Sequence, residues 1–94
     1  MEIRYFIDPD TKLPHIYEHG ISEDDVEDVL RRPSEDRPGT EGSRVALGQT
    51  RGGHYLRVIY VPDPEPNSVF VITAYQLTGK ALTAYRRRRR RRPK

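Results

Sequence analysis

The chain has 94 residues, no cysteine and a formal net charge of +3, which excludes a disulfide-stapled scaffold and a cysteine-based metal site. This length indicates one domain with a thin core, in which several strands share a buried face. No apolar run is long enough to span a bilayer, and the start, MEIRYFIDPD, lacks the pattern of a signal peptide. We therefore expect a soluble, cytoplasmic protein without a membrane partner.

The charge is distributed unevenly along the chain. Eight of the 17 basic residues are Lys94 and the seven arginines at positions 86–92. Residues 1–85 hold the other nine together with all 14 acids, so this body carries a formal charge of −5. We expect a single domain at residues 1–85 and a basic, arginine-rich tail at residues 86–94.

The N-terminal part predicts a strand and a short helical segment. Residues 2–8, EIRYFID, alternate as a strand does, and the sequence DPD ends the strand with turn-forming residues. Residues 14–20, PHIYEHG, begin with a proline suited to the first helical position and end with a glycine suited to the left-handed residue after the last turn.

The clearest local signal is a helix at residues 22–32. Ser22 suits the N-cap, and Asp25, three residues on, completes a capping box. Ile21 and Val26 form a hydrophobic staple, and Pro33 stops the helix. Five acids make its outer face a solvated surface that is poorly suited to RNA.

Three strand-like runs follow a polar loop at residues 33–43. Residues 44–49 and 54–61 are joined by the tight turn TRGG, and a proline-rich loop leads to residues 69–77. These runs predict an antiparallel meander, with the N-terminal strand at one edge. LTGKALTAY then adds a last helical turn or two. The fold class we expect is α+β: a twisted antiparallel sheet, with one or two helices on one face.

The arginine run admits two readings. Seven adjacent like charges repel one another in a helix, so we expect the tail to be disordered beyond its first turn. Opposite phosphates the same charges bind by releasing counterions, without reading sequence. The alternative is a passive, solubilising end. The candidate nucleic-acid-binding residues are Arg86, Arg87, Arg88, Arg89, Arg90, Arg91 and Arg92.

The body lacks the motifs of several enzyme classes. There is no serine in a GxSxG turn, no phosphate loop and no dinucleotide fingerprint. His15 and His19 are four residues apart, but the glutamate of a zinc-protease helix is missing and a third ligand would have to be His54 or a carboxylate. We expect a structural or surface histidine pair, and neither a metal nor a cofactor.

Arg57 is the residue that most needs an explanation. On a strand it shares a face with Tyr55 and Ile59, in an otherwise apolar run, and an unpaired buried guanidinium is costly. Either Arg57 forms an ion pair with an acid, or its face is an open concavity that accepts an anion. Arg44 and Tyr75 on the neighbouring strands are candidates to line that concavity.

The stretches HGISEDDVEDVLRRP, SRVALGQT, YLRVIYV and VFVITAYQLTGKALTAYRRR resemble the BrnT-like branch of the RelE/ParE-like toxin superfamily, or a related family of uncharacterised bacterial domains. The resemblance covers about residues 1–88. It implies a RelE-like sheet with helices on one face and an RNA-binding concavity on the other. It further implies a type II toxin-like endoribonuclease that cleaves messenger RNA on the ribosome and is neutralised by a partner antitoxin.

Carried onto this chain, the resemblance assigns catalysis to arginine, tyrosine or histidine side chains. The candidates are Arg57, Arg44, His54, Tyr75 and Tyr85. Such cleavage uses the 2′-OH as nucleophile and needs no metal, while arginine stabilises the phosphate charge and a histidine or tyrosine transfers protons. By strand alternation, however, His54 faces away from Arg57.

One departure from the family pattern leaves the function open. Toxin bodies of this kind are usually basic, whereas this body is acidic apart from the tail. The first hypothesis is therefore a toxin whose arginine tail compensates for the acidic body. The second is a non-catalytic module that binds nucleic acid or a protein on the same fold. The third is a small structural or regulatory protein with a passive tail.

Overall fold

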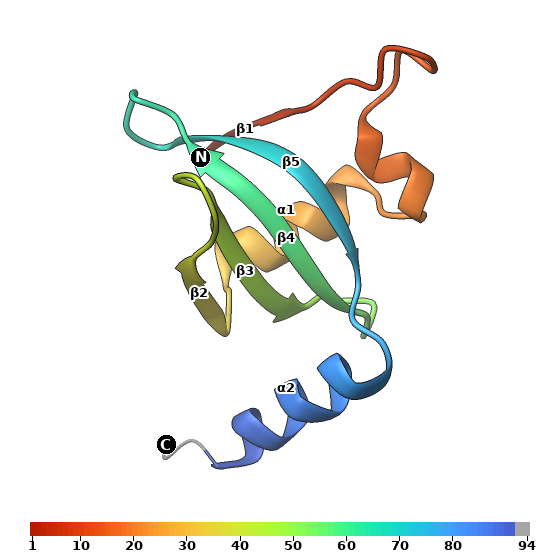
Figure 1. The fold of residues 1–94 in the computed structure, drawn as a ribbon, viewed down its shortest axis with the longest axis vertical. Helices are drawn as coiled ribbons and strands as arrows, with labels where there is room; N and C mark the ends of the chain where they lie inside the picture. Colours follow the sequence, from red (N-terminus) through yellow and green to blue (C-terminus); the bar gives the residue numbers. More distant parts are fainter. Residues whose placement is uncertain (92–94) are drawn as a thin grey trace.

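The structure, a computed structural model, describes residues 1–91, and the side chains of residues 1–90. It is an α+β fold with a sheet, a short 3₁₀ helix (η1) and two α-helices (Figure 1). The elements in chain order are β1 Glu2–Tyr5, η1 His15–His19, α1 Glu23–Arg31, β2 Glu35–Pro38, β3 Arg44–Gln49, β4 Tyr55–Pro62, β5 Ser68–Gln76 and α2 Gly79–Arg91.

The sheet has five strands in the order β1-β5-β4-β3-β2. The predicted meander is confirmed, since β3, β4 and β5 pair antiparallel in succession. The N-terminal strand lies at an edge, as expected, but it pairs parallel with β5, so the sheet is mixed and the expectation of a wholly antiparallel sheet was wrong. The long connection between β1 and β5, through η1, α1 and strands β2 to β4, allows these two strands to run in the same direction.

Strand β2 was not predicted, because it lies in the expected polar loop. Glu35–Pro38 pairs antiparallel with β3 at the other edge of the sheet, and three of its four residues are exposed. Because most side chains of this edge strand are exposed, its sequence does not alternate between apolar and polar residues, and the strand could not be predicted from that pattern. Its charged residues and Pro38 are features that protect sheet edges from pairing with another chain.

The main core lies between one face of the sheet and the segment η1–α1 (Figure 1). It is built from apolar side chains of both layers, Ile16, Ile21, Val26, Val29, Ala46, Leu56, Val58, Tyr60, Val71 and Ala74. The backbone of β3 comes close to α1, because a Cβ on Gly48 would lie 3.2 Å from Cγ1 of Val29. We call this face of the sheet the α1 face.

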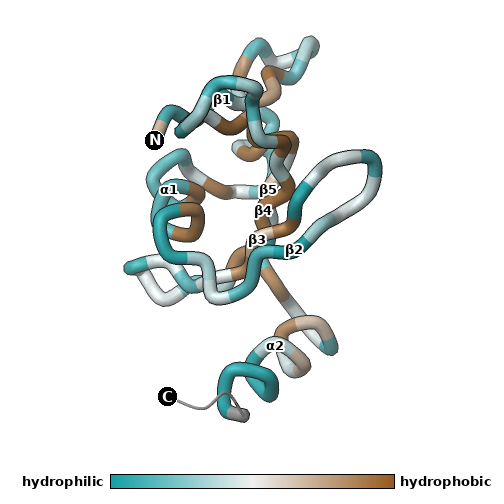
Figure 2. The backbone as a smooth tube through the Cα atoms, turned by 90° about the vertical axis from the view of Figure 1, so that its left-hand side faces the viewer, coloured by the Kyte–Doolittle hydropathy of each residue, from teal (hydrophilic) through white to brown (hydrophobic). Residues whose placement is uncertain are grey.

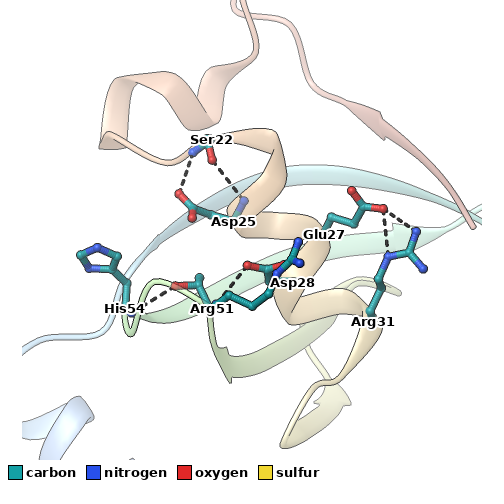
Figure 3. Close-up of polar contacts among 8 residues, drawn as sticks. Ser22, Asp25, Glu27, Asp28, Arg31, Arg51 and His54 are labelled. Carbon is teal, nitrogen blue, oxygen red and sulfur yellow. Dashed lines mark hydrogen bonds and ion pairs between the residues drawn. The ribbon is translucent and has the colours of Figure 1, made fainter.

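The start of α1 is as predicted. Ser22 Oγ accepts a hydrogen bond from the Asp25 backbone N–H at 3.1 Å, and the Asp25 carboxylate accepts one from the Ser22 N–H at 3.1 Å (Figure 3). Farther along the helix, Asp28 accepts hydrogen bonds at 3.0 Å from both the backbone N–H and the Nε of Arg51. Asp28 thus joins α1 to the β3–β4 hairpin.

The opposite face of the sheet is covered in part by α2, and we call it the α2 face. Figure 1 shows α1 behind the sheet and α2 at its lower end. The expectation that helices pack on one face only was therefore wrong, because the side chains of α2 meet the other face. Within residues 1–91, no helix has both the length and the apolar character needed to cross a bilayer.

Candidate nucleic-acid interface

A second, smaller apolar cluster joins α2 to the sheet. Its buried members are Val45, Leu47, Leu77 and Tyr85, and Tyr55, Ile59 and Leu82 pack against them. The sheet residues alternate with those of the main core, so one strand supplies side chains to both faces. Along α2 the composition changes from apolar near the sheet to strongly hydrophilic at its end (Figure 2). The first half of α2 therefore packs against the sheet, and the second half is exposed to solvent.

Tyr85 is the anchor of this contact. It is 1% exposed, its ring meets that of Tyr55 edge-to-face at 5.6 Å, and its hydroxyl forms a hydrogen bond with Ser34 Oγ. Ser34 Oγ also donates to the backbone carbonyl of Leu47 at 2.9 Å, which ties α2 to β3. A side chain so fully enclosed is not available to contact RNA, so the structure gives Tyr85 a packing position in place of the catalytic one that the resemblance implied.

The arginine run is not a disordered tail as far as the structure describes it. Residues 86–91 continue α2, and Arg92 lies outside the described residues. Arg88 donates two hydrogen bonds to the Glu35 carboxylate on β2, at 2.7 and 3.1 Å, and this raises the pKa of Arg88. Arg86 lies over the Tyr55 ring at 5.0 Å. These contacts, together with the favourable position of cations at a helix C-terminus, offset the repulsion that predicted disorder.

An open hollow of about 270 Å³ lies where α2 meets the ends of β3 and β4. Its lining residues are Gln49, Tyr55, Tyr85, Arg86, Arg89 and Arg90. All three arginines are exposed. Within the described part of the chain, neither Arg89 nor Arg90 forms an ion pair with an acid. The hollow therefore holds guanidinium groups whose charge is not neutralised by any acid in the part of the chain that the structure describes.

Arg57 lies on the α2 face, in register between Leu47 and Tyr75. Its Nε is buried and has no hydrogen-bond partner among the described residues, and none of the acids described there forms an ion pair with it. The structural ion pair that sequence reasoning left open is thus not found in this part of the chain. A buried donor without an acceptor is costly, and a bound anion is one way to satisfy it.

Arg44 does not join Arg57. It pairs in register with Tyr60, whose side chain belongs to the α1 face, and its Nε donates to Asp36 Oδ1 at 2.9 Å. Tyr60 donates a hydrogen bond to the other oxygen of Asp36 at 2.6 Å. Burial, and to a lesser extent this hydrogen bond, raises the pKa of Tyr60 to about 12. The expectation that Arg44 lines the same concavity as Arg57 was wrong, because the two residues point to opposite faces.

His54 also lies away from Arg57, as strand alternation predicted. Its Nδ1 is 3.3 Å from Nε2 of Gln76, which is paired with Leu56 of the α1 face, and its backbone N–H donates to Thr50 Oγ1 (Figure 3). Of the five candidate catalytic residues, only Arg57 and Tyr75 are paired in register at partly exposed positions, and the Tyr75 ring lies 6.0 Å from that of His19 in η1.

The two helices divide the charge of the molecule. The acids of α1 are Glu23, Asp24, Asp25, Glu27 and Asp28, and this helix covers the α1 face. The arginines of α2 lie on the side of the opposite face. These two helices therefore concentrate charge of opposite sign on opposite faces of the sheet.

A family model described as a domain of unknown function (DUF4258) matches residues 15–76, more than half of the chain. The chain belongs to the DUF4258 family. Neither the curated proteins nor the solved structures include a match to it.

In this DUF4258 chain the matched segment runs from η1 to the end of β5, so the arginine-bearing helix lies outside it. The sequence pointed to the arginines and placed Tyr55 on the face of Arg57, but it did not point to Gln49, which borders the arginines, or to Glu35, which pairs with Arg88. The sequence feature that indicates packing of α2 on the sheet is the spacing of Leu82 and Tyr85. These apolar residues are three positions apart and so lie on one side of a helix.

Proposed function

We propose that this protein is an RNA-binding module that holds the phosphate backbone with the arginines of α2. The observation that carries the proposal is the hollow in which Arg86, Arg89 and Arg90 gather beside the sheet, on a helix anchored by Tyr85. Arginine suits phosphate because its planar guanidinium donates two parallel hydrogen bonds. Each phosphate that it neutralises releases counterions, which supplies affinity at low salt.

The anchoring distinguishes this surface from a flexible basic tail. A disordered arm must be ordered when it binds, whereas a packed helix presents its charges in a fixed arrangement. The acids on α1 lie on the other side of the molecule and are repelled by phosphates. Charge alone therefore orients the protein with α2 toward RNA, and we expect little sequence preference, since phosphate contacts carry no sequence information.

The RelE-like assignment and the link to the ribosome belong to this proposal. An antiparallel meander with η1 and α1 on one face and Arg57 on the other is compatible with the arrangement that the BrnT-like resemblance implies. The basic helix outside the acidic body supplies the positive charge that a ribosome-binding protein needs.

The test removes Arg89 and Arg90, the two arginines of the hollow that form no ion pair with a described acid and no ring contact with a described residue. We expect Arg89→Gln/Arg90→Gln to weaken binding to a labelled single-stranded RNA by about 25-fold at 100 mM KCl, because each phosphate contact contributes about fivefold at that salt. The slope of log K against log [KCl] should become shallower by about 1.4. Fluorescence anisotropy between about 50 and 200 mM KCl measures both quantities.

The matched control is Arg31→Gln/Arg51→Gln, which removes the same charge from arginines that pair with Glu27 and Asp28 on the acidic side. It should leave the salt slope unchanged. Equal losses in the two double variants would show that only net charge matters, and wild-type affinity in Arg89→Gln/Arg90→Gln would rule out the hollow as the binding site.

A second candidate, the metal-independent endoribonuclease, is favoured by Arg57. The buried Nε of Arg57, which has no hydrogen-bond partner among residues 1–90, lies on a strand position paired with Tyr75 and is a cationic donor that an RNA phosphate could satisfy during cleavage. The acid and base that such cleavage needs are not supplied by His54 or Tyr85 in this arrangement, so the binding module is preferred. Growth inhibition on induced expression, relieved by a partner antitoxin, would favour the enzyme.

A further inference from the structure

A second site lies at the other end of the molecule, in the turn that joins β1 to η1. Asp8, His15 and Glu18 converge there from two segments of the chain. His15 Nδ1 is 2.9 Å from Glu18 Oε2 and 3.4 Å from Asp8 Oδ2, and the three ligand atoms all lie within 4.8 Å of one another. We propose that Asp8, His15 and Glu18 form a binding site for a divalent first-row transition metal ion.

The separations fit a shared metal ion. Nitrogen and oxygen ligands bind such ions at about 2.1 Å, so two ligands lie about 3.0 Å apart at octahedral angles and about 3.4 Å apart at tetrahedral angles. The two separations from His15 Nδ1 fall close to these values, and the Asp8 and Glu18 oxygens lie within 4.8 Å of each other. One imidazole with two carboxylates is also a donor set that suits borderline divalent ions.

The three groups are poorly explained as an ion pair alone. A single Nδ1–H can point at one carboxylate oxygen, yet two lie in front of it. The carboxylates are also close to each other, and this contact lowers the pKa of Asp8 to about 2 and raises that of Glu18. These opposite shifts mean that Glu18 shares its proton with Asp8, and a divalent cation between the two carboxylates can take the place of that proton.

The backbone holds the site in place. Asp8 Oδ1 accepts from the Asp10 N–H at 2.8 Å and from the Thr11 N–H at 3.4 Å, which leaves Oδ2 directed at His15. The Asp8 side chain is only 13% exposed. The His15 N–H donates to the Phe6 carbonyl at 2.9 Å, so the turn is closed where the ligands meet.

Two neighbouring rings contact the His15 imidazole and restrict its orientation. Phe6 lies 6.0 Å away and His19 5.3 Å away, both edge-to-face. His15 and Glu18 are 31% and 46% exposed, so the remaining coordination positions are open to water. His15 and His19 are in ring contact, as expected for a structural pair, and the proposed site adds two acids to His15, with His19 orienting its ring.

The test is titration calorimetry of the full-length, chelator-treated protein with ZnCl₂, MnCl₂ and MgCl₂. We expect one zinc ion per chain, tighter binding of zinc than of manganese, and the weakest binding for magnesium. Zinc should also raise the melting temperature of the protein. Once the free zinc concentration exceeds the dissociation constant, each further fivefold increase in that concentration should add about 4–8 °C. EDTA should reverse the shift.

Two variants keep the turn intact. Asp8→Asn retains the Oδ1 acceptor for the backbone, and Glu18→Gln lies outside that turn. Each should weaken zinc binding at least about tenfold with an unchanged circular dichroism spectrum. Matched controls are Asp24→Asn, an exposed acid of α1, and His54→Gln, a histidine remote from the cluster; both should bind zinc as the wild type does. Absence of zinc binding up to about 1 mM, or wild-type affinity in both site variants, would overturn the proposal.

Discussion

Tyr85→Ala is expected to lower the free energy of unfolding by about 3–5 kcal/mol, the range for truncating a large buried aromatic side chain. Tyr85 is 1% exposed and is the largest member of the cluster that joins α2 to the sheet. Such a loss is a large share of the stability of a domain of this size. Urea unfolding followed by circular dichroism measures it.

The same variant should weaken RNA binding, because α2 loses the contact that holds its arginines beside the sheet. Tyr85→Phe keeps the ring and removes only the hydroxyl that meets Ser34, so it should cost about 0.5–1.5 kcal/mol and leave RNA binding unchanged. If Tyr85→Phe abolished an RNA-cleaving activity while the fold persisted, Tyr85 would be catalytic and our packing assignment wrong. A cost below about 1 kcal/mol for Tyr85→Ala would mean that α2 is not docked.

Arg57→Met is expected to separate function from stability. Methionine keeps an unbranched apolar stem and removes the buried Nε, which has no partner among the described residues, so the free energy of unfolding should stay equal or rise by up to about 1 kcal/mol. RNA binding should weaken about fivefold at 100 mM KCl if Arg57 contacts a phosphate. If the protein cleaves messenger RNA, the rate should fall by about 10²–10³, the loss of one transition-state donor of about 2.7–4 kcal/mol.

The matched control for Arg57 is Arg44→Met. Arg44 lies on the opposite face and pairs with Asp36, so its loss should leave RNA binding and any cleavage unchanged. Anisotropy, urea unfolding and cleavage assays on translating ribosomes give the three readouts. Reduced stability of Arg57→Met with unaltered RNA binding would assign Arg57 a structural role and remove the second candidate function.

Local chemistry accounts for the parts of the fold that were predictable. The capping box of α1 depends on two residues three positions apart, and it formed as expected. The meander followed from apolar runs separated by turns, with β3 at the predicted residues and β4 and β5 shifted by one. The position of His54, facing away from Arg57, followed from the two-residue period of a strand.

Other features depend on contacts between distant segments, which no local pattern records. Strand β2 exists because β3 offers it a free edge, and its own residues are nearly all exposed. The arginine helix continues to residue 91 because Glu35, 53 positions before Arg88, and Tyr55, on another strand, receive its side chains.

The sequence by itself determined the class of fold, the helix at α1, the meander and the concentration of positive charge at the C-terminus. The tertiary structure alone decided which side chains meet. It set Arg44 and Arg57 on opposite faces, enclosed Tyr85, and brought Asp8 to His15 and Glu18. The physical reason is that spacing along one element fixes the direction of its own side chains, whereas the partner on another element depends on strand register and packing.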